Sequence, residues 1–302
     1  MVVVNVVCYI VALFLEPFSL IFRHFSSYFR RLVFVILRQG RIPTHIAFIM
    51  DGNRRYATKR RLAKRSDGHL HGSRKFEEIL KWSLELGVKE VTVYAFSIEN
   101  FKRPKEEVDT LMRLATEKLE ELVQNRIRVV GELDLLPHEV LKSACSAMYY
   151  TRHYTNHIVN ICFPYTSTAE ILSASNRLLQ SGFAPTESRL SQLMWVGVPD
   201  IVVRTSGERR LSDFLTWQCS QKPSPMIAFV DAFWPDFGLR HLLPMLLRYQ
   251  IQVKRHQRQE TEEESQEWTA FLQKQDQEYW DKIRAAAWKD PLSPPASPWI
   301  AK

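Results

Sequence analysis

Short apolar runs rich in β-branched and aromatic residues alternate along the chain with longer segments whose apolar residues recur every three or four positions. The short runs predict strands. They lie at residues 46–50, 91–96, 127–130, 158–163, 200–203 and 227–230. The periodic segments predict helices, at about residues 73–86, 105–125, 137–150 and 168–179. Because strands and helices alternate, we expect an α/β fold whose mainly parallel sheet is covered by helices on both faces.

The first 38 residues follow a different pattern. Residues 1–15 are apolar and uncharged, but Glu16 and Pro17 interrupt the run, so it falls short of the about 20 apolar residues that a transmembrane helix needs. A signal peptide is not expected either, because no basic region precedes the run. From Phe18 to Ile36, apolar residues recur at helical spacing with arginines between them. This pattern predicts a basic amphipathic helix in a membrane interface, with packing on the protein's own core as the alternative.

The C-terminal part changes character again. Residues 250–290 are charged and mostly helix-forming, and residues 291–302 are typical of a flexible tail. We therefore expect three parts. They are a membrane-associating segment over residues 1–38, a central domain that carries the chemistry over residues 39–250, and an exposed helical extension with its tail over residues 251–302.

The composition indicates a globular protein and leaves the class of its partner open. Of the 302 residues, 45% are apolar and 12% are aromatic, which is enough for a packed core. The formal net charge of +8 favours a polyanion as partner: nucleic acid, an anionic membrane surface or a phosphorylated substrate. The four cysteines form no CxxC pair, so we expect reduced thiols in a cytosol-facing domain and no structural zinc.

Charged residues gather where the first predicted strand ends. Asp51, Gly52 and Asn53 follow it directly, and Arg54 and Arg55 come next. Ligands bind at this end of the strands in open parallel sheets. A carboxylate there can hold a divalent cation, and the planar fork of arginine N–H groups suits phosphate. These residues predict a site for Mg²⁺ with a diphosphate, and the alternative is an Asp-Gly turn followed by a solvated basic face.

Two more polar clusters follow predicted strands, at residues 97–103 and 204–212. In the second cluster, three arginines, Gly207 and a helix that we expect to begin near Leu211 would form another anion site. The serine and the asparagine of the first cluster have a structural alternative. Both could simply cap the helix that we expect to begin near Lys105.

These clusters resemble the signatures of the cis-prenyltransferases, the family that includes undecaprenyl diphosphate synthase. Residues 46–56 are similar to its first signature, residues 97–104 to its second and residues 200–218 to its most diagnostic one, and residues 233–237 add a fourth. The four stand in the family's order within about residues 43–245. The Arg-Arg-Tyr spelling at the end of the first resembles the eukaryotic branch, the catalytic subunits of dehydrodolichyl diphosphate synthase.

The resemblance implies a single α/β domain with a mainly parallel sheet of about six strands, enclosing an apolar tunnel. Helices that begin near Ser73 and Lys105 would wall this tunnel. The implied reaction is the repeated cis condensation of isopentenyl diphosphate onto an allylic diphosphate, with farnesyl diphosphate as the expected primer. The product would be a long-chain polyprenyl diphosphate for dolichol synthesis and protein glycosylation. The chain carries no DDxxD motif of the trans-prenyltransferases.

The resemblance also implies roles for individual residues. Asp51 would bind Mg²⁺, and Asp51 and Asn100 would be catalytic, with the bound diphosphate as the alternative proton acceptor to Asn100. The positions that contact substrate in the family match Gly52, Asn53, Arg54, Arg55, Tyr56, Arg65, His69, Ser97, Glu99, Phe101, Arg103, Arg204, Arg210 and Ser212. Among them, Arg65 and His69 match contacts of the allylic diphosphate. The contacts of isopentenyl diphosphate match Arg204, Arg210 and Ser212.

A second subunit is also implied. In homodimeric bacterial members of the family, a C-terminal Arg-x-Gly reaches the neighbouring site, whereas the last glycine here is Gly238. This difference resembles the eukaryotic heteromers, in which a Nogo-B-receptor-like subunit supplies the motif. The alternative is a homomer whose site is closed by another backbone segment. With residues 1–38, the resemblance implies a location at the cytosolic face of the endoplasmic reticulum membrane.

Two other functions are compatible with parts of the sequence. A non-catalytic partner subunit of the same fold would lack the Asp-Gly-Asn-Arg and Arg-Thr-Ser-Gly-Glu sets, and this chain carries both. A basic nucleic-acid-binding protein would need stacking aromatics interleaved with its basic residues, whereas the arginines here gather at strand ends. We therefore expect no nucleic-acid partner.

Overall fold

The computed structural model describes residue 28 and residues 30–64, 67–253 and 265–287. The chain divides into two compact units, Met1–Ile42 and Pro43–Lys302. Within the first unit, residues 30–37 are helical, and most of the expected amphipathic segment lies outside the described residues. Among the residues that the structure describes, no helix combines the length and the apolar composition needed to cross a bilayer.

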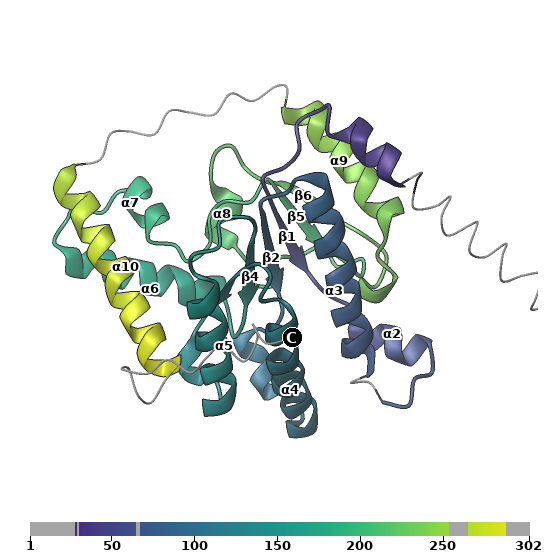
Figure 1. Ribbon diagram of the computed structural model, residues 1–302, viewed down its shortest axis with the longest axis horizontal. Helices are drawn as coiled ribbons and strands as arrows, with labels where there is room; N and C mark the ends of the chain where they lie inside the picture. Colours follow the sequence, from purple (N-terminus) through teal and green to yellow (C-terminus); the bar gives the residue numbers. More distant parts are fainter. Residues whose placement is uncertain (1–27, 29, 65–66, 254–264, 288–302) are drawn as a thin grey trace, which may run out of the picture. The chain divides into compact units, whose positions relative to one another are not determined.

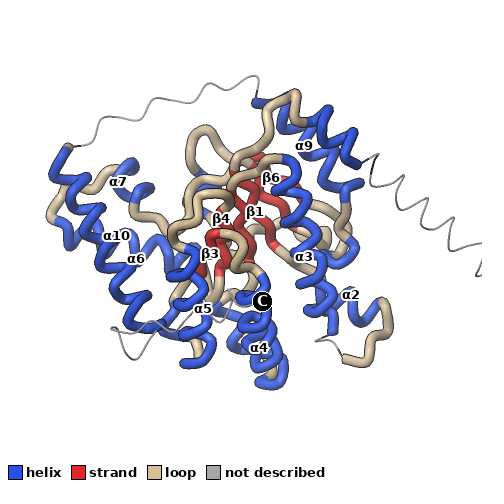
Figure 2. The backbone as a smooth tube through the Cα atoms, in the orientation of Figure 1, coloured by secondary structure: helices blue, strands red, loops and turns tan. Residues whose placement is uncertain are grey.

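The second unit is built on a six-stranded sheet in which every neighbouring pair of strands is parallel. The strands lie together among the helices (Figure 2). The strands lie in the order β3-β4-β2-β1-β5-β6. They are β1 (His45–Ile49), β2 (Glu90–Tyr94), β3 (Arg126–Val130), β4 (Ile158–Cys162), β5 (Ile201–Arg204) and β6 (Met226–Phe229). Both β1 and β5 are buried along their whole length, as expected for strands of a parallel sheet with both faces covered. The predicted α/β fold is therefore confirmed.

Helices connect the strands and surround the sheet (Figure 1). The α-helices are α2 (Asn53–Lys59), α3 (Asp67–Leu86), α4 (Lys105–Glu121), α5 (His138–Thr151), α6 (Ser167–Ser181), α7 (Glu187–Gln192), α8 (Thr216–Ser220), α9 (Leu239–Val253) and α10 (Gln266–Ala287). Three short 3₁₀ helices are η1 (Ile98–Lys102), η2 (Leu133–Leu135) and η3 (Trp234–Asp236). Side chains alternate between the two faces of each strand, so Val129 and Ile161 line a cavity beside α3, α4 and α5, while Val130 and Cys162 point the other way.

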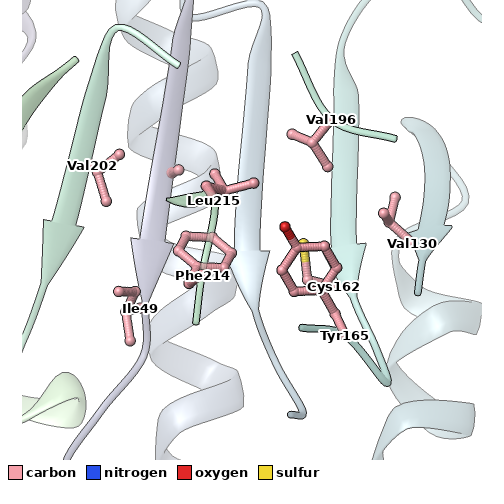
Figure 3. Packing of buried hydrophobic residues seen from close by; sticks show 9 residues of the cluster. Ile49, Val130, Cys162, Tyr165, Val196, Val202, Phe214 and Leu215 are labelled. Carbon is pink, nitrogen blue, oxygen red and sulfur yellow. The ribbon is translucent and has the colours of Figure 1, made fainter. Parts of the chain in front are cut away.

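On that other face, Phe214 and Leu215 are fully buried among residues of β1, β4 and β5 (Figure 3). The ring of Phe214 stacks on Tyr94 with 4.7 Å between the centroids. It also packs edge-on against Tyr165, with a centroid distance of 6.0 Å. This cluster holds the segment that follows β5 against the sheet.

The helix that we expected near Leu211 is not formed there, and the prediction was wrong. Residues 211–215 form a bent segment, and α8 begins only at Thr216. Three residues of the segment have φ angles of 52°, 57° and 47°, which a right-handed helix does not contain. They are Ser212, Asp213 and Leu215. The reversal of the backbone lets Phe214 and Leu215 both enter the aromatic cluster, a long-range contact that local sequence does not reveal.

The expected exposed extension also needs correction, because one face of α10 is buried. Trp268 is fully buried against Ala174, Leu178 and Leu193. Its indole Nε1 donates a hydrogen bond to Gln192 Oε1 at 2.8 Å. Phe271 of the same helix packs against this cluster as well, so α10 buries part of its surface against the rest of the second unit.

A buried polar network lies near the amino-terminal end of β1. His45 is 4% exposed, and its Nε2 lies 2.6 Å from the Thr92 hydroxyl. Asn160 Nδ2 donates to the same hydroxyl at 2.9 Å. Burial lowers the pKa of His45, although Glu90 and Asp200 act in the opposite sense. The imidazole is therefore neutral in the folded protein near neutral pH.

We predict that this histidine makes folding stability depend on pH. The unfolded chain binds a proton at a pKa of about 6.5, while the folded chain resists protonation, so stability falls as the pH drops below that value. One unit below it, a histidine that stays neutral when folded removes up to about 1.4 kcal/mol. Thermal unfolding of the wild type should shift more between about pH 7.5 and about pH 5.5 than that of His45→Gln. Equal shifts in the two proteins would contradict the prediction.

Candidate active site

The ends of β1 and β5 bring the first and third polar clusters together. The strands pair in parallel with Ile49 opposite Arg204, so Asp51 and Arg204 meet at the carboxyl edge of the sheet. Arg204 Nη2 donates to Asp51 Oδ2 at 2.9 Å. Thr205 Oγ1 accepts from Asp51 N at 3.0 Å and holds the turn in place. The structure thus places two of the predicted site residues in direct contact.

Arg204 also shapes the segment after β5. Its side chain is only 4% exposed, and its Nη1 donates to the backbone oxygen of Arg210 and, at 2.7 Å, to Ser212 Oγ. Tyr94 supports the same segment, because its hydroxyl donates to Ser212 O at 3.3 Å. Burial raises the pKa of Tyr94 to about 12, so this donor keeps its proton. Three predicted residues, Arg204, Arg210 and Ser212, are therefore neighbours.

A chain of alternating charges extends this cluster across the sheet edge. Arg55 Nη1 donates to Glu208 Oε1 at 2.9 Å, and Arg210 Nη1 donates to the other oxygen of Glu208. Arg55 Nη2 lies 3.5 Å from Asp51 Oδ1, and its guanidinium carbon lies 5.7 Å from the centre of the Phe233 ring. Glu208 was not among the residues predicted from the sequence, although its place between Gly207 and the paired arginines could have suggested it.

Two glycines allow the backbone to come close at this edge. Gly52 has φ of 100°, and a Cβ atom there would lie 2.8 Å from Phe233 Cδ1. On α3, a Cβ atom at Gly72 would lie 2.4 Å from the Asn53 side-chain oxygen. The close approach seats Asn53 against α3, at the point where β1 passes into α2. Trp234 links η3 to α3, because its Nε1 donates a hydrogen bond to Gly72 O at 2.8 Å.

A second basic cluster surrounds Glu107 of α4. Arg103 Nη1 donates to Glu107 Oε1 at 3.0 Å, and His69 Nε2 lies 3.5 Å from the same oxygen. Arg54 Nη1 lies 3.9 Å from Oε2. Burial, followed by Arg103, lowers the pKa of His69, so its ring is neutral near pH 7. Glu107 was not predicted as a site residue, because an acid in the first turn of a helix is also an ordinary helix-start signal.

Ser97 and Asn100 form a capping box around η1. Ser97 Oγ accepts from Glu99 N at 3.2 Å, and Asn100 Oδ1 accepts from Ser97 N at 3.1 Å. The two residues therefore do cap a helix, as the structural alternative predicted, but the helix is η1 and not α4. The cap uses only the oxygen of the Asn100 amide, and its Nδ2 is not part of it.

The remaining predicted residues lie at the margin of these clusters. The Tyr56 ring packs against His71, with 5.5 Å between the centroids. Glu99 is exposed and pairs with Lys102, and Phe101 packs edge-on against Phe96. Arg65 lies outside the described residues.

An apolar cavity of about 120 Å³ opens beside both clusters. Met50, Asn53 and His69 form its end nearest to the polar edge. Its walls are Phe76 of α3, Leu111, Leu114, Ala115 and Leu119 of α4, Val140 and Ala144 of α5, and Val93, Val129 and Ile161 of the sheet. The cavity thus lies between α3 and α4, where the tunnel was expected.

Several buried polar atoms at this edge have no hydrogen-bond partner. They are Asn53 Oδ1, His69 Nε2, Arg204 Nε and Ser206 Oγ. Buried polar groups are normally hydrogen-bonded, so their presence beside five arginines is typical of a site that a polar ligand completes. Among the described residues, no three acidic, histidine or cysteine groups come together to hold a metal. The arrangement fits a ligand with an anionic head and an apolar tail.

Comparison with known proteins agrees with this geometry. The family described as "Putative undecaprenyl diphosphate synthase" matches residues 49–257. A subunit of the dehydrodolichyl diphosphate synthase complex from Schizosaccharomyces pombe is 41% identical over 235 residues, covering 72% of this chain and 88% of that protein. The Homo sapiens subunit is 41% identical over 244 residues, with 74% and 72% covered. Lavandulyl diphosphate synthase from Lavandula x intermedia, solved with dimethylallyl diphosphate, has a TM-score of 0.64 at 28% identity, covering 69% of this chain and 95% of that one.

We predict that Arg204 and Arg210 differ in their effect on stability. Arg204→Ala leaves Asp51 without this partner and frees the segment around Ser212, so the free energy of unfolding should fall by about 1–3 kcal/mol. Arg210→Ala removes a side chain that is 62% exposed, and its effect should stay within about 0.5 kcal/mol. Urea unfolding of both variants measures the difference. Equal losses would mean that the Asp51–Arg204 pair does not hold this edge.

Proposed function

Because this chain belongs to the undecaprenyl diphosphate synthase family of prenyltransferases, we propose that it condenses isopentenyl diphosphate in cis onto an allylic diphosphate, repeatedly, to make a long-chain polyprenyl diphosphate. The apolar cavity that opens beside the arginine-rich sheet edge carries this proposal. Relatives named as dehydrodolichyl diphosphate synthase subunits support a dolichol-type product. Farnesyl diphosphate is the primer that we propose.

The cluster around Glu107 is suited to the allylic substrate. Arg54, Arg103 and His69 lie at the mouth of the cavity, so a diphosphate held there would direct its hydrocarbon chain between α3 and α4. Breaking the allylic C–O bond leaves an allylic cation and a highly charged diphosphate. Fixed guanidinium groups stabilise the negative charge that develops on the leaving group, without reorganisation of solvent.

The cluster at the end of β5 is suited to isopentenyl diphosphate. Arg210 and Ser212 would bind its diphosphate, while Arg204 orients both of them through its own hydrogen bonds. Holding the alkene against the allylic carbon favours formation of the new C–C bond. The proton that must then leave has two candidate acceptors. One is the Asn100 amide, which is a very weak base, and the other is the bound diphosphate.

Asp51 is the residue that we propose as the protein ligand of Mg²⁺. Its carboxylate is 30% exposed at the sheet edge and stands among arginines that suit phosphate, so the donor set fits a cation shared with substrate oxygens and water. A cage made by protein groups alone does not fit, because no three acidic, histidine or cysteine side chains come together to hold a metal among the described residues. When bound, Mg²⁺ would act as a Lewis acid and neutralise part of the negative charge on the diphosphate.

The two rival functions are less consistent with the site. A non-catalytic subunit would not need both arginine clusters beside an open apolar cavity. Nucleic-acid binding would need stacking aromatics interleaved with the basic residues, whereas the arginines here gather at the ends of strands and pair with Asp51 and Glu208.

We predict that Asp51→Asn lowers turnover by at least about a hundredfold, because the amide cannot neutralise a cation or replace the carboxylate charge. The amide oxygen can still accept the hydrogen bond from Arg204, so the fold should be retained. Incorporation of radiolabelled isopentenyl diphosphate measures turnover, and circular dichroism checks the fold. Glu117→Gln, at a carboxylate that is 59% exposed on α4, is the matched control. Folded Asp51→Asn protein with more than a few per cent of wild-type turnover would refute this role.

We further propose that the enzyme works with a Nogo-B-receptor-like second subunit of the same fold. Two relatives are named as subunits of a complex, and this supports the proposal. The chain purified from a host without such subunits should make little long-chain product, and co-expression should restore it. Comparable rates from the chain alone and from the co-expressed pair would contradict the heteromer.

The cytosolic face of the endoplasmic reticulum membrane is the location that we propose, because the product is strongly apolar and residues 1–38 combine an apolar run with arginines. We predict that the full chain sediments with anionic vesicles and that a form lacking residues 1–38 stays in the supernatant. If the shortened form still sediments at high salt, another part of the protein binds the membrane.

A further inference from the structure

The apolar cavity is too small for the product proposed above, and the inference that follows rests on that function. Its volume of about 120 Å³ is below the about 150 Å³ of a cavity that holds one benzene ring. The cavity therefore accommodates about one five-carbon unit beyond the diphosphate. A polyprenyl chain that grows by repeated addition must therefore push two walls of the cavity apart.

One wall of the cavity lies between α3 and α4. Leu114 of α4 lines the cavity on one side and a polar recess on the outer side of the two helices. The recess is formed by residues of both elements, including Asp67 and Leu70 of α3 and Thr110 of α4. At this point a single side chain separates the cavity from solvent.

Polar pairs join the two helices on either side of Leu114. At the end near the site, His69 faces Glu107 at 3.5 Å. Two turns further along α3, Glu77 Oε1 accepts a hydrogen bond from Lys118 Nζ at 2.6 Å. We call the line from the first pair to the second the α3–α4 seam. Charged or polar groups face each other at both of its ends.

Lys118 is an unusual residue for its position, because it lines a cavity whose other α4 residues are apolar. Its ammonium group is held by Glu77 of α3 and by Glu121 of its own helix. Burial acts to lower the pKa of Lys118, but the hydrogen bonds with Glu121 and Glu77 raise it above its ordinary value. The lysine stays charged, and only the pair with Glu77 crosses the seam.

We propose that the Lys118–Glu77 ion pair is a brace across the α3–α4 seam that limits how far the cavity opens and thereby determines the length of the polyprenyl product. The side chains of Lys118 and Glu77 are 20% and 43% exposed. Ion pairs at such exposure are weak, so the brace yields as the chain lengthens but opposes each added unit. Weakening the brace lengthens the product.

The product distribution of Glu77→Gln tests this proposal, with Glu121→Gln as the matched control. Both variants remove one carboxylate from Lys118, but only the first breaks the link between the helices. The full chain of each is assayed with labelled isopentenyl diphosphate and farnesyl diphosphate in the same assembly state. Glu77→Gln should lengthen the main product by at least one five-carbon unit, and Glu121→Gln should leave it unchanged. The exchanged pair Glu77→Lys with Lys118→Glu should restore the wild-type length.

Solvent access to the cavity gives a second measurement that does not require turnover. Leu111 lines the cavity and is 8% exposed, so Leu111→Cys reports entry of a thiol reagent. Adding Glu77→Gln should raise its modification rate by up to about fivefold, the effect expected from losing an exposed ion pair. Adding Glu121→Gln should not change it.

The outcomes separate the two proposals. Wild-type product with an unshifted Glu77→Gln distribution, or equal modification rates in the two double variants, would overturn the brace alone. A wild-type enzyme that forms no polyprenyl product would overturn the proposed function and the brace with it.

Discussion

The ion pair between Asp51 and Arg204 is the interaction on which the site depends. It joins the ends of two neighbouring strands whose residues are 153 positions apart in the sequence. The guanidinium of Arg204 is only 4% exposed, and the Asp51 carboxylate stabilises its charge at this depth. The remaining N–H groups of Arg204 then fix the segment that carries Arg210 and Ser212. One pair thus sets the position of the cluster at the end of β5 relative to the end of β1.

The backbone after β5 is held in an unfavourable conformation by burial of apolar side chains. Each residue with positive φ costs about 1–2 kcal/mol in a chain of L-amino acids. Full burial of Phe214 and Leu215 contributes about 1.5–3 kcal/mol each. The two free energies are of similar size, so burial in the aromatic cluster offsets the backbone strain and keeps Ser212 within hydrogen-bond distance of Arg204. The hydrophobic core on one face of the sheet therefore shapes a polar site at its edge.

The opposite face serves the apolar part of a ligand. Glu107 gathers Arg54, Arg103 and His69 from three other segments at the mouth of the cavity. Its carboxylate offsets the charge of the two arginines and keeps the three groups close together, in positions where a diphosphate would meet several donors at once. Beyond them, the walls are mostly apolar, and the charge of Lys118 is directed away to Glu77. The anionic head of a substrate would thus lie among the arginines, and its apolar tail would lie in the cavity.

The sequence by itself determined the six strands, the parallel α/β class and the polar clusters at strand ends, because these depend on local periodicity and on the rule that strand ends share one edge. Tertiary structure decided the rest. It replaced the helix expected near Leu211 with a bent segment, buried Trp268 of the supposed exposed extension, and brought Glu107 and Glu208 into the site. Each depends on partners distant in the chain, and the free energy of such contacts is set by burial and charge pairing that neighbouring residues do not encode.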